Sequence, residues 1–234
     1  TGKFSAALLK RYRKAEVVAV DLAPAMLART QNRGGWLRKP SCICADAEQL
    51  PFADDSFEFI FSNLMLQWCV DLEHTLTELR RVLAPGGLLM FTTFGPDTLM
   101  ELRASWESVD GHTHVNRFPD LHDVGDLLVR TRWADPVMDS ERITVTYREL
   151  GRLMKDLKQI GAHNVTAGRP RGLTGHRRWQ QFSAAYEHYR SDGVLPASYE
   201  VVYGHAWSPV NKYAGRGNEV PLASLTPPGS RSGR

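Results

Sequence analysis

Two aspartates early in the chain stand after short apolar segments that suit buried strands. Asp21 ends the segment EVVAVD, and Asp46 follows the segment SCICA. Because the carboxyl ends of neighbouring parallel strands lie on one rim of a sheet, we expect the two carboxylates to lie close together. Two such acceptors suit the ribose diol and the exocyclic amine of an adenosine, with Leu22, Met26 and Leu64 as apolar walls or as core residues. An aspartate at a strand end is also a common turn former or helix cap.

A second polar group lies in the segment HTHVNRF, residues 112–118. In this segment Arg117 stands among His114, Asn116 and Phe118. The planar guanidinium of arginine can bond both oxygens of a carboxylate, so Arg117 is a candidate for orienting a carboxylate substrate. The alternative is that His114 caps a helix and Arg117 is a solvated surface charge.

Residues 164–181 form a basic stretch without a single acid. Its arginines are Arg169, Arg171, Arg177 and Arg178. Because complementary charge steers protein encounters, the stretch suits the docking of an acidic protein. A solvated basic loop would explain the same composition.

The sequence has no Ser-His-Asp or Cys-His signature of an activated nucleophile. Cys42, Cys44 and Cys69 lack the paired spacing of a zinc site or a disulfide framework, so we expect no metal and reduced, largely buried thiols. A carboxylate substrate would need no general base, because its pKa of about 4 leaves it ionised at neutral pH.

Composition excludes other classes of protein. The 234 residues are 42% hydrophobic, which is enough for one substantial core, and they carry a formal charge of +3. The charge comes from the segment after Trp207, so the remaining body is neutral, which argues against a general nucleic-acid binder. No apolar run approaches the roughly 20 residues that span a bilayer, and the first residues do not resemble a signal peptide. We therefore expect a cytoplasmic protein.

The segment Ala45–Phe94 predicts a strand, a helix and a second parallel strand. Residues 57–61 and 88–94 are apolar runs of strand length, and between them leucines recur at helical spacing. Pro85-Gly86-Gly87 is expected to end the helix with a left-handed glycine cap. The unit is the right-handed crossover of an α/β sheet, in which helices cover a mostly parallel sheet on both faces.

The remaining chain is expected to complete one domain that covers residues 1–207. Residues 96–134 and 148–198 are interpreted as helical and loop excursions on the substrate side, with strands at 143–147 and 199–207. Residues 208–234 are rich in Pro, Gly, Ser and Arg and are predicted to be disordered.

The motifs resemble class I methyltransferases that depend on S-adenosylmethionine, in VVAVDLAPAML, ADAEQLPFADDSFEFIFSNLMLQW and ELRRVLAPGGLLMFTTFGPDTLMELR. More narrowly, FGPDTLMELR, DGHTHVNRFPDLHDVGDLL, LKQIGAHNVTAGRPRGLTG and LPASYEVVYGHAW resemble the malonyl-acyl-carrier-protein O-methyltransferases of biotin synthesis. The resemblance extends to Trp207 and implies a doubly wound, Rossmann-like α/β fold, with S-adenosylmethionine as cofactor and malonyl-acyl carrier protein as substrate. It implies cofactor contacts from Gly2, Asp21, Leu22, Asp46, Ala47 and Asn63. It also implies substrate contacts from His114, Asn116 and Arg117 and carrier docking on Arg169, Arg171, Arg177 and Arg178.

In the resembling family a strand and a glycine-rich loop normally precede the position of Thr1-Gly2. That strand lies between the strand ending at Asp21 and the strand ending at Ser62. Without it, buried strands would present unpaired backbone groups. We therefore expect the chain to be a fragment that is unstable alone and binds the cofactor weakly.

Three alternatives remain from the sequence. Related sequences include a complex I assembly factor that hydroxylates an arginine, but Arg117 is not expected in that pattern. A methyltransferase of another small acid is a second alternative. A methyltransferase of nucleic acid is the third, although the neutral body and the lack of an Asn-Pro-Pro-Tyr or Cys motif argue against it.

Overall fold

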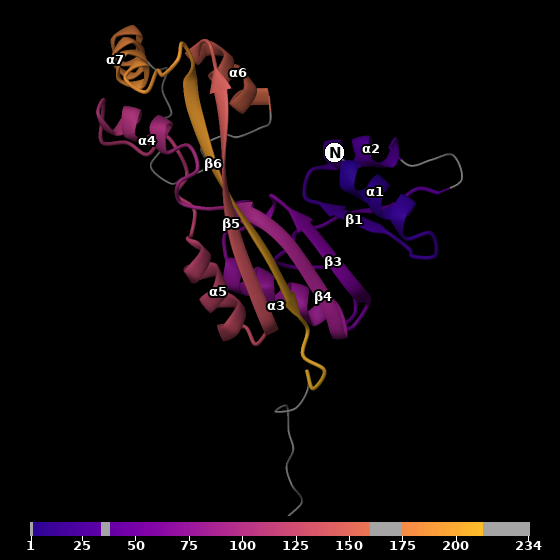
Figure 1. Ribbon diagram of the computed structural model, residues 1–234. Helices are drawn as coiled ribbons and strands as arrows, with labels where there is room; N and C mark the ends of the chain where they lie inside the picture. The colour runs from indigo at the N-terminus through magenta and orange to yellow at the C-terminus, as the bar shows by residue number, and fades with distance from the viewer. Residues whose placement is uncertain (1, 34–37, 160–174, 213–234) are drawn as a thin grey trace, which may run out of the picture.

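The computed structural model describes residues 2–33, 38–159 and 175–212 and has an α/β fold, as expected (Figure 1). Its elements in chain order are α1 Lys3–Arg11, β1 Val18–Asp21, α2 Pro24–Gln31, β2 Ser41–Cys44, β3 Phe57–Asn63, the 3₁₀ helix η1 Leu66–Trp68, α3 Leu72–Val82, β4 Leu83–Phe94, α4 Met100–Glu107, α5 Leu121–Arg130, β5 Ala134–Tyr147, α6 Leu150–Gln159, α7 His176–Glu187 and β6 Leu195–Trp207. Among these residues, every helix is too short or too polar to cross a bilayer. The predicted tail of residues 208–234 lies outside the described part from residue 213 onward.

The first sheet is the parallel pair β1–β2, in which Asp21 lies opposite Cys44. β1 ends at Asp21 as predicted, whereas β2 ends two residues before Asp46. α2 packs on this pair through the buried side chain of Leu27. The parallel pairing places the carboxyl ends of both strands on one rim.

The second sheet is mixed and has the order β3-β4-β6-β5. β3 and β4 are parallel, and β6 is antiparallel to both β4 and β5. α3 and α5 lie on one face, where their leucines and Val124 enclose a core with Leu89 and Phe91 of β4 (Figure 1). The predicted strand-helix-strand unit is thus confirmed.

The predicted glycine cap of α3 is wrong. The helix ends at Val82, and Leu83 is already extended and begins β4. Gly86, with φ of 75°, lies inside the strand, where the register shifts from Phe57 opposite Leu83 to Phe59 opposite Leu88. The glycine therefore serves a bulge, because pairing with β3 draws the chain into the strand directly after the helix.

The two sheets share no strand pairing within the described residues. α1 connects them by aromatic packing instead. The rings of Phe4 and Phe61 have centroids 5.2 Å apart, and those of Tyr12 and Phe59 are 6.5 Å apart. Ile60, on the opposite side of β3, packs against the core beneath α3 and α5.

β5 and β6 form a long antiparallel ribbon that extends beyond the sheet (Figure 1). Both strands are longer than predicted, because residues before each expected segment continue the ladder. At its far end lie α4, α6 and α7, which enclose a separate core around Trp106, Phe182 and Tyr186. The excursions expected at 96–134 and 148–198 thus gather largely around a core of their own.

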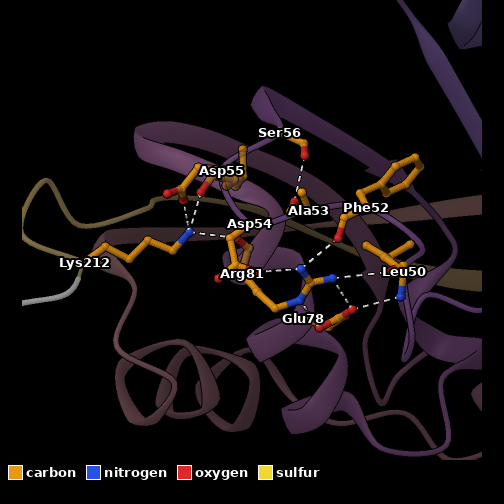
Figure 2. A network of polar contacts seen from close by, with 10 residues as sticks. Leu50, Phe52, Ala53, Asp54, Asp55, Ser56, Glu78, Arg81 and Lys212 are labelled. Carbon is orange, nitrogen blue, oxygen red and sulfur yellow. Dashed lines mark hydrogen bonds and ion pairs between the residues drawn. The ribbon is translucent and has the colours of Figure 1, made fainter. Parts of the chain in front are cut away.

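A network of polar contacts fixes the segment between β2 and β3 (Figure 2). Arg81 of α3 donates to the carbonyls of Leu50 and Phe52 and to the carboxylates of Asp54 and Glu78. The hydrogen bond from Arg81 holds the pKa of the Glu78 carboxyl below its ordinary value. This segment begins at Asp46, so the network helps to set the rim of the first sheet.

Lys212 binds beside the same network of polar contacts. Its Nζ donates to Asp55 Oδ1 at 2.5 Å and to the carbonyls of Arg81 and Leu83 at 2.8 and 2.6 Å (Figure 2). The Lys212 side chain is only 5% exposed. Its ammonium group therefore satisfies buried acceptors at the junction of α3 and β4.

We predict that Lys212→Met lowers the free energy of unfolding by about 1–3 kcal/mol, because it leaves these acceptors without their donor. Urea unfolding would measure the effect as a lower midpoint with an unchanged slope. Lys158→Met, at an exposed position on α6, is the matched control and should stay within about 0.5 kcal/mol of the original chain. Equal midpoints for Lys212→Met and the control would contradict the prediction.

Candidate functional site

Asp21 and Asp46 lie at the carboxyl ends of β1 and β2, in two similar turns. Asp21 Oδ1 accepts the N–H of Ala23 at 2.8 Å, and Asp46 Oδ1 accepts the N–H of Glu48 at 3.0 Å. Each aspartate thus forms the local turn that the sequence left open as an alternative. The second oxygen of each carboxylate has no hydrogen-bond partner among the described residues and can accept from a ligand.

The other predicted cofactor residues are distributed over the start of α1, the turns after β1 and β2, and the end of β3. Gly2 caps α1 with φ of 69°, and a Cβ there would lie 2.7 Å from the backbone of Thr30. Leu22 is 68% exposed, as a residue that lines a ligand site can be. Asn63 ends β3 and accepts from the Thr92 hydroxyl at 3.1 Å. Ala47 lies in the turn after Asp46, so these residues stay predicted contacts on strand ends and adjoining turns.

The predicted substrate loop is built around Asp110. Its Oδ1 accepts the N–H of His112 at 3.0 Å and lies 2.8 Å from His114 Nε2. The His114 ring stacks on Trp106 at 3.9 Å with planes 11° apart. His114 therefore does not cap a helix, because its Nε2 is engaged by Asp110 and one ring face by Trp106. Direct substrate contact by His114 stays a prediction.

Arg117 is the exposed member of the loop. Its side chain is 83% exposed, and its guanidinium lies 4.0 Å from Glu107 Oε1. Asn116 is half-buried. Phe118 packs on Phe94 with ring centroids 5.6 Å apart, which places the end of the loop beside the carboxyl end of β4. Arg117 is thus able to bind an anion without breaking a strong ion pair.

A pocket of about 230 Å³ adjoins this loop. It is lined by residues of α4 and of the loop, namely Arg103, Trp106, Glu107, Asp110, Gly111, His112, Thr113, His114, Val115 and Arg117. Arg103 is itself held by the carbonyls of Pro96 and Thr98, each at 2.9 Å. The pocket combines an indole wall with two arginines and with the carboxylates of Glu107 and Asp110, so Arg117 is the group in it that can bind an acidic ligand.

The predicted docking arginines divide into two groups. Arg169 and Arg171 lie outside the described residues. Arg177 and Arg178 begin α7, and both are exposed. Arg178 Nη1 lies 3.9 Å from Asp110 Oδ2, so it belongs as much to the substrate loop as to a docking surface.

Two buried or bridging acids were missed by sequence reasoning. Glu101 of α4 is 3% exposed, and it accepts from the Ser198 hydroxyl at 2.5 Å and from the Ser198 N–H at 3.1 Å. Glu48 Oε1 accepts the N–H groups of Val70 and Asp71, which ties the Asp46 turn to the start of α3. Both partners are distant in sequence, so no local spacing signals either role. Burial of Tyr199, near Glu101, raises the pKa of its hydroxyl to about 12.

The fold is that of the class I methyltransferases. A family model described as a methyltransferase domain matches residues 1–91. A crystal structure from Bacillus halodurans C-125 superposes with a TM-score of 0.62 at 20% identity, covering 89% of each chain, which supports the fold.

Relatives with high sequence identity identify a family within this class. The malonyl-(acyl-carrier protein) O-methyltransferase of Halorhodospira halophila is 54% identical over 209 residues, which cover 88% of this chain and 71% of that protein. The protein of the same name from Laribacter hongkongensis is 52% identical over 217 residues, which cover 89% and 73% of the two chains. The chain belongs to the family of malonyl-(acyl-carrier protein) O-methyltransferases.

We predict that Asp21→Ala and Asp46→Ala each weaken S-adenosylmethionine binding by about 1.5–3 kcal/mol, because each removes a charged hydrogen-bond acceptor. Calorimetric titration of the cofactor would measure the loss. Asp192→Ala is the control, since Asp192 is an exposed acid just before β6. Unchanged affinity in both variants would remove the basis for a cofactor site on this rim.

Proposed function

We propose that the chain transfers a methyl group from S-adenosylmethionine to the free carboxylate of a malonyl thioester on acyl carrier protein, an early step of biotin biosynthesis. The observation that carries the proposal is the 54% identity with the Halorhodospira halophila enzyme over 88% of the chain. The proposed product is an ester without the charge of the free acid, which suits it to enzymes that elongate neutral acyl chains.

The strand-end residues fit S-adenosylmethionine. Asp21 would hold the ribose hydroxyls and Asp46 the amine of adenine, while Leu22 would cover the purine and Gly2, Ala47 and Asn63 would line the site. When bound, the cofactor supplies an activated methyl group on a sulfonium. The task left to the protein is to position the acceptor, which can contribute roughly 7–11 kcal/mol.

Arg117 is proposed to orient the malonyl carboxylate. A carboxylate is ionised at neutral pH and can attack without a general base, which agrees with the absence of a nucleophile signature in the sequence. The exposed guanidinium of Arg117 can bond both carboxylate oxygens, and its ion pair with Glu107 at 4.0 Å is weak enough to yield. The rings of Phe118 and Phe94 support the loop beside the sheet.

The alternatives are less well supported. The relatives compared above are O-methyltransferases by name, which does not favour an arginine hydroxylase of the complex I assembly type. A different small acid as substrate would still use Arg117 but not the basic face of α7. Cytoplasmic location stays a prediction from the sequence.

The direct test is incubation with malonyl-acyl carrier protein and S-adenosylmethionine followed by intact-mass measurement. We expect a gain of about 14 Da on the carrier, the mass of one methyl group replacing a proton. Succinyl-acyl carrier protein tests the choice of acid, and a chain with both Asp21→Ala and Asp46→Ala is the inactive control. Absence of the gain with a folded, cofactor-binding chain would contradict the proposal.

We predict that Arg117→Lys lowers kcat/KM for malonyl-acyl carrier protein at least about tenfold while the affinity for S-adenosylmethionine stays unchanged, because lysine keeps the charge but loses the planar fork. Steady-state kinetics and calorimetry would measure the two effects. Arg152→Lys on the exposed face of α6 is the matched control. Turnover by Arg117→Lys at the original rate would assign the carboxylate to another residue.

We predict that Arg177→Glu raises the KM for malonyl-acyl carrier protein and flattens its salt dependence, since surface charge acts mainly on encounter. A small malonyl thioester without the carrier should react as before. Arg152→Glu controls for charge alone. An equal loss with the small thioester would place Arg177 in the active site or in the fold.

A further inference from the structure

Three flat rings from three segments form a continuous stack beside the pocket. His114 of the substrate loop lies on Trp106 of α4, and Trp106 lies on Phe182 of α7 at 4.1 Å with planes 9° apart. Trp106 and Phe182 are buried in the core around α4 and α7. The loop thus packs on the two helices through His114 and through the buried side chain of Val115.

Asp110 fixes the orientation of this outer ring. A stacked imidazole can still flip by 180° about its Cβ–Cγ bond, but the carboxylate lies 2.8 Å from His114 Nε2 and defines that nitrogen as the donor. The same Oδ1 accepts the N–H of His112, so Asp110 holds the loop by a backbone contact as well. Two anchor points on one oxygen set both the course of the loop and the position of its histidine.

The other oxygen of Asp110 faces α7. Arg178 Nη1 lies 3.9 Å from Asp110 Oδ2, which forms no hydrogen bond within the described residues. The Asp110 side chain is 11% exposed. Burial by itself would raise the pKa of this carboxyl, but hydrogen bonds from His114 and His112 bring it below the ordinary value, so the group is charged at neutral pH. Because a buried carboxylate is costly without hydrogen bonds, its contacts with His114 and His112 are strongly favoured.

We infer that Asp110 is a positioning residue, whose carboxylate fastens the loop that carries Arg117 to α4 through His114, while Arg178 of α7 faces its other oxygen. Arg117 has no comparable restraint of its own, since its ion-pair partner Glu107 is 4.0 Å away. Its position therefore depends on the backbone of the loop, which Asp110 holds together with the buried Val115 and with Phe118. The inference rests on the proposed role of Arg117 in binding the substrate carboxylate.

The kinetic test is a double-mutant cycle with Asp110→Ala, Arg117→Gln and the chain carrying both changes. We expect Asp110→Ala to raise the KM for malonyl-acyl carrier protein about tenfold, because a displaced Arg117 binds the substrate carboxylate less well. The affinity for S-adenosylmethionine should stay unchanged. If Asp110 acts through Arg117, the double variant has the KM of Arg117→Gln alone. A double variant whose fold-change is the product of the single ones overturns the inference.

Hydrogen exchange of residues 111–118 separates the inference from the proposed function. Asp110→Ala should speed exchange in this loop, and Asp139→Ala, at an exposed position on β5, should not. If Arg117→Gln keeps the original KM while the loop still loosens in Asp110→Ala, the proposed role of Arg117 is contradicted and the fastening is upheld. Unchanged exchange in Asp110→Ala overturns the fastening itself.

Asp110→Asn keeps the test valid if the alanine variant does not fold. Asparagine retains the shape and one acceptor oxygen, so the contact with the N–H of His112 can persist, while the charge that faces Arg178 is lost. We expect an intermediate rise in KM and intermediate exchange in the loop. Behaviour equal to that of the original chain in both measurements would show that the charge of Asp110 has no positioning role.

Discussion

β6 is the strand on which the arrangement of the whole molecule depends. It pairs with β4 on one side and with β5 on the other, and its ladder with β5 continues past the sheet to α4, α6 and α7 (Figure 1). The turn after β4 is fastened to it, since Gly95 and Leu99 donate their N–H groups to the carbonyls of Glu200 and Ser198. Because the turn leads into α4, these bonds decide where the substrate loop begins.

The polar groups around β6 form hydrogen bonds with partners that are far away in the sequence. The Glu200 carboxylate accepts the N–H of Asp97 at 2.9 Å, and a Cβ at Gly95 would lie 2.4 Å from that carboxyl group, so a side chain there would displace the carboxylate. Glu101 accepts both polar hydrogens of Ser198 in the buried interior. A buried acid without such partners would be costly, so these pairs make one arrangement of the turn and α4 strongly preferred.

Charge is distributed differently in the two halves of the molecule. On the first sheet, acids at strand ends leave acceptor oxygens for a ligand rich in hydroxyl and amino groups. Around α4 and α7, arginines surround one partly buried acid, Asp110, and Arg117 remains exposed. The first arrangement suits an adenosine, and the second suits an acidic substrate and an acidic carrier. A methyltransferase must bring these two kinds of ligand together.

The sequence by itself determined the strand-helix-strand unit, the strand that ends at Asp21 and the identity of the family, because apolar periodicity and local motifs depend on neighbours in the chain. Only the tertiary structure decided that Gly86 serves a bulge, that His114 stacks on Trp106 and that Arg178 faces Asp110. The last two contacts join α4, the loop and α7, which are separate segments of the chain. Their geometry is set by the β5–β6 ribbon and its core, and long-range packing of this kind leaves no periodic trace in the sequence.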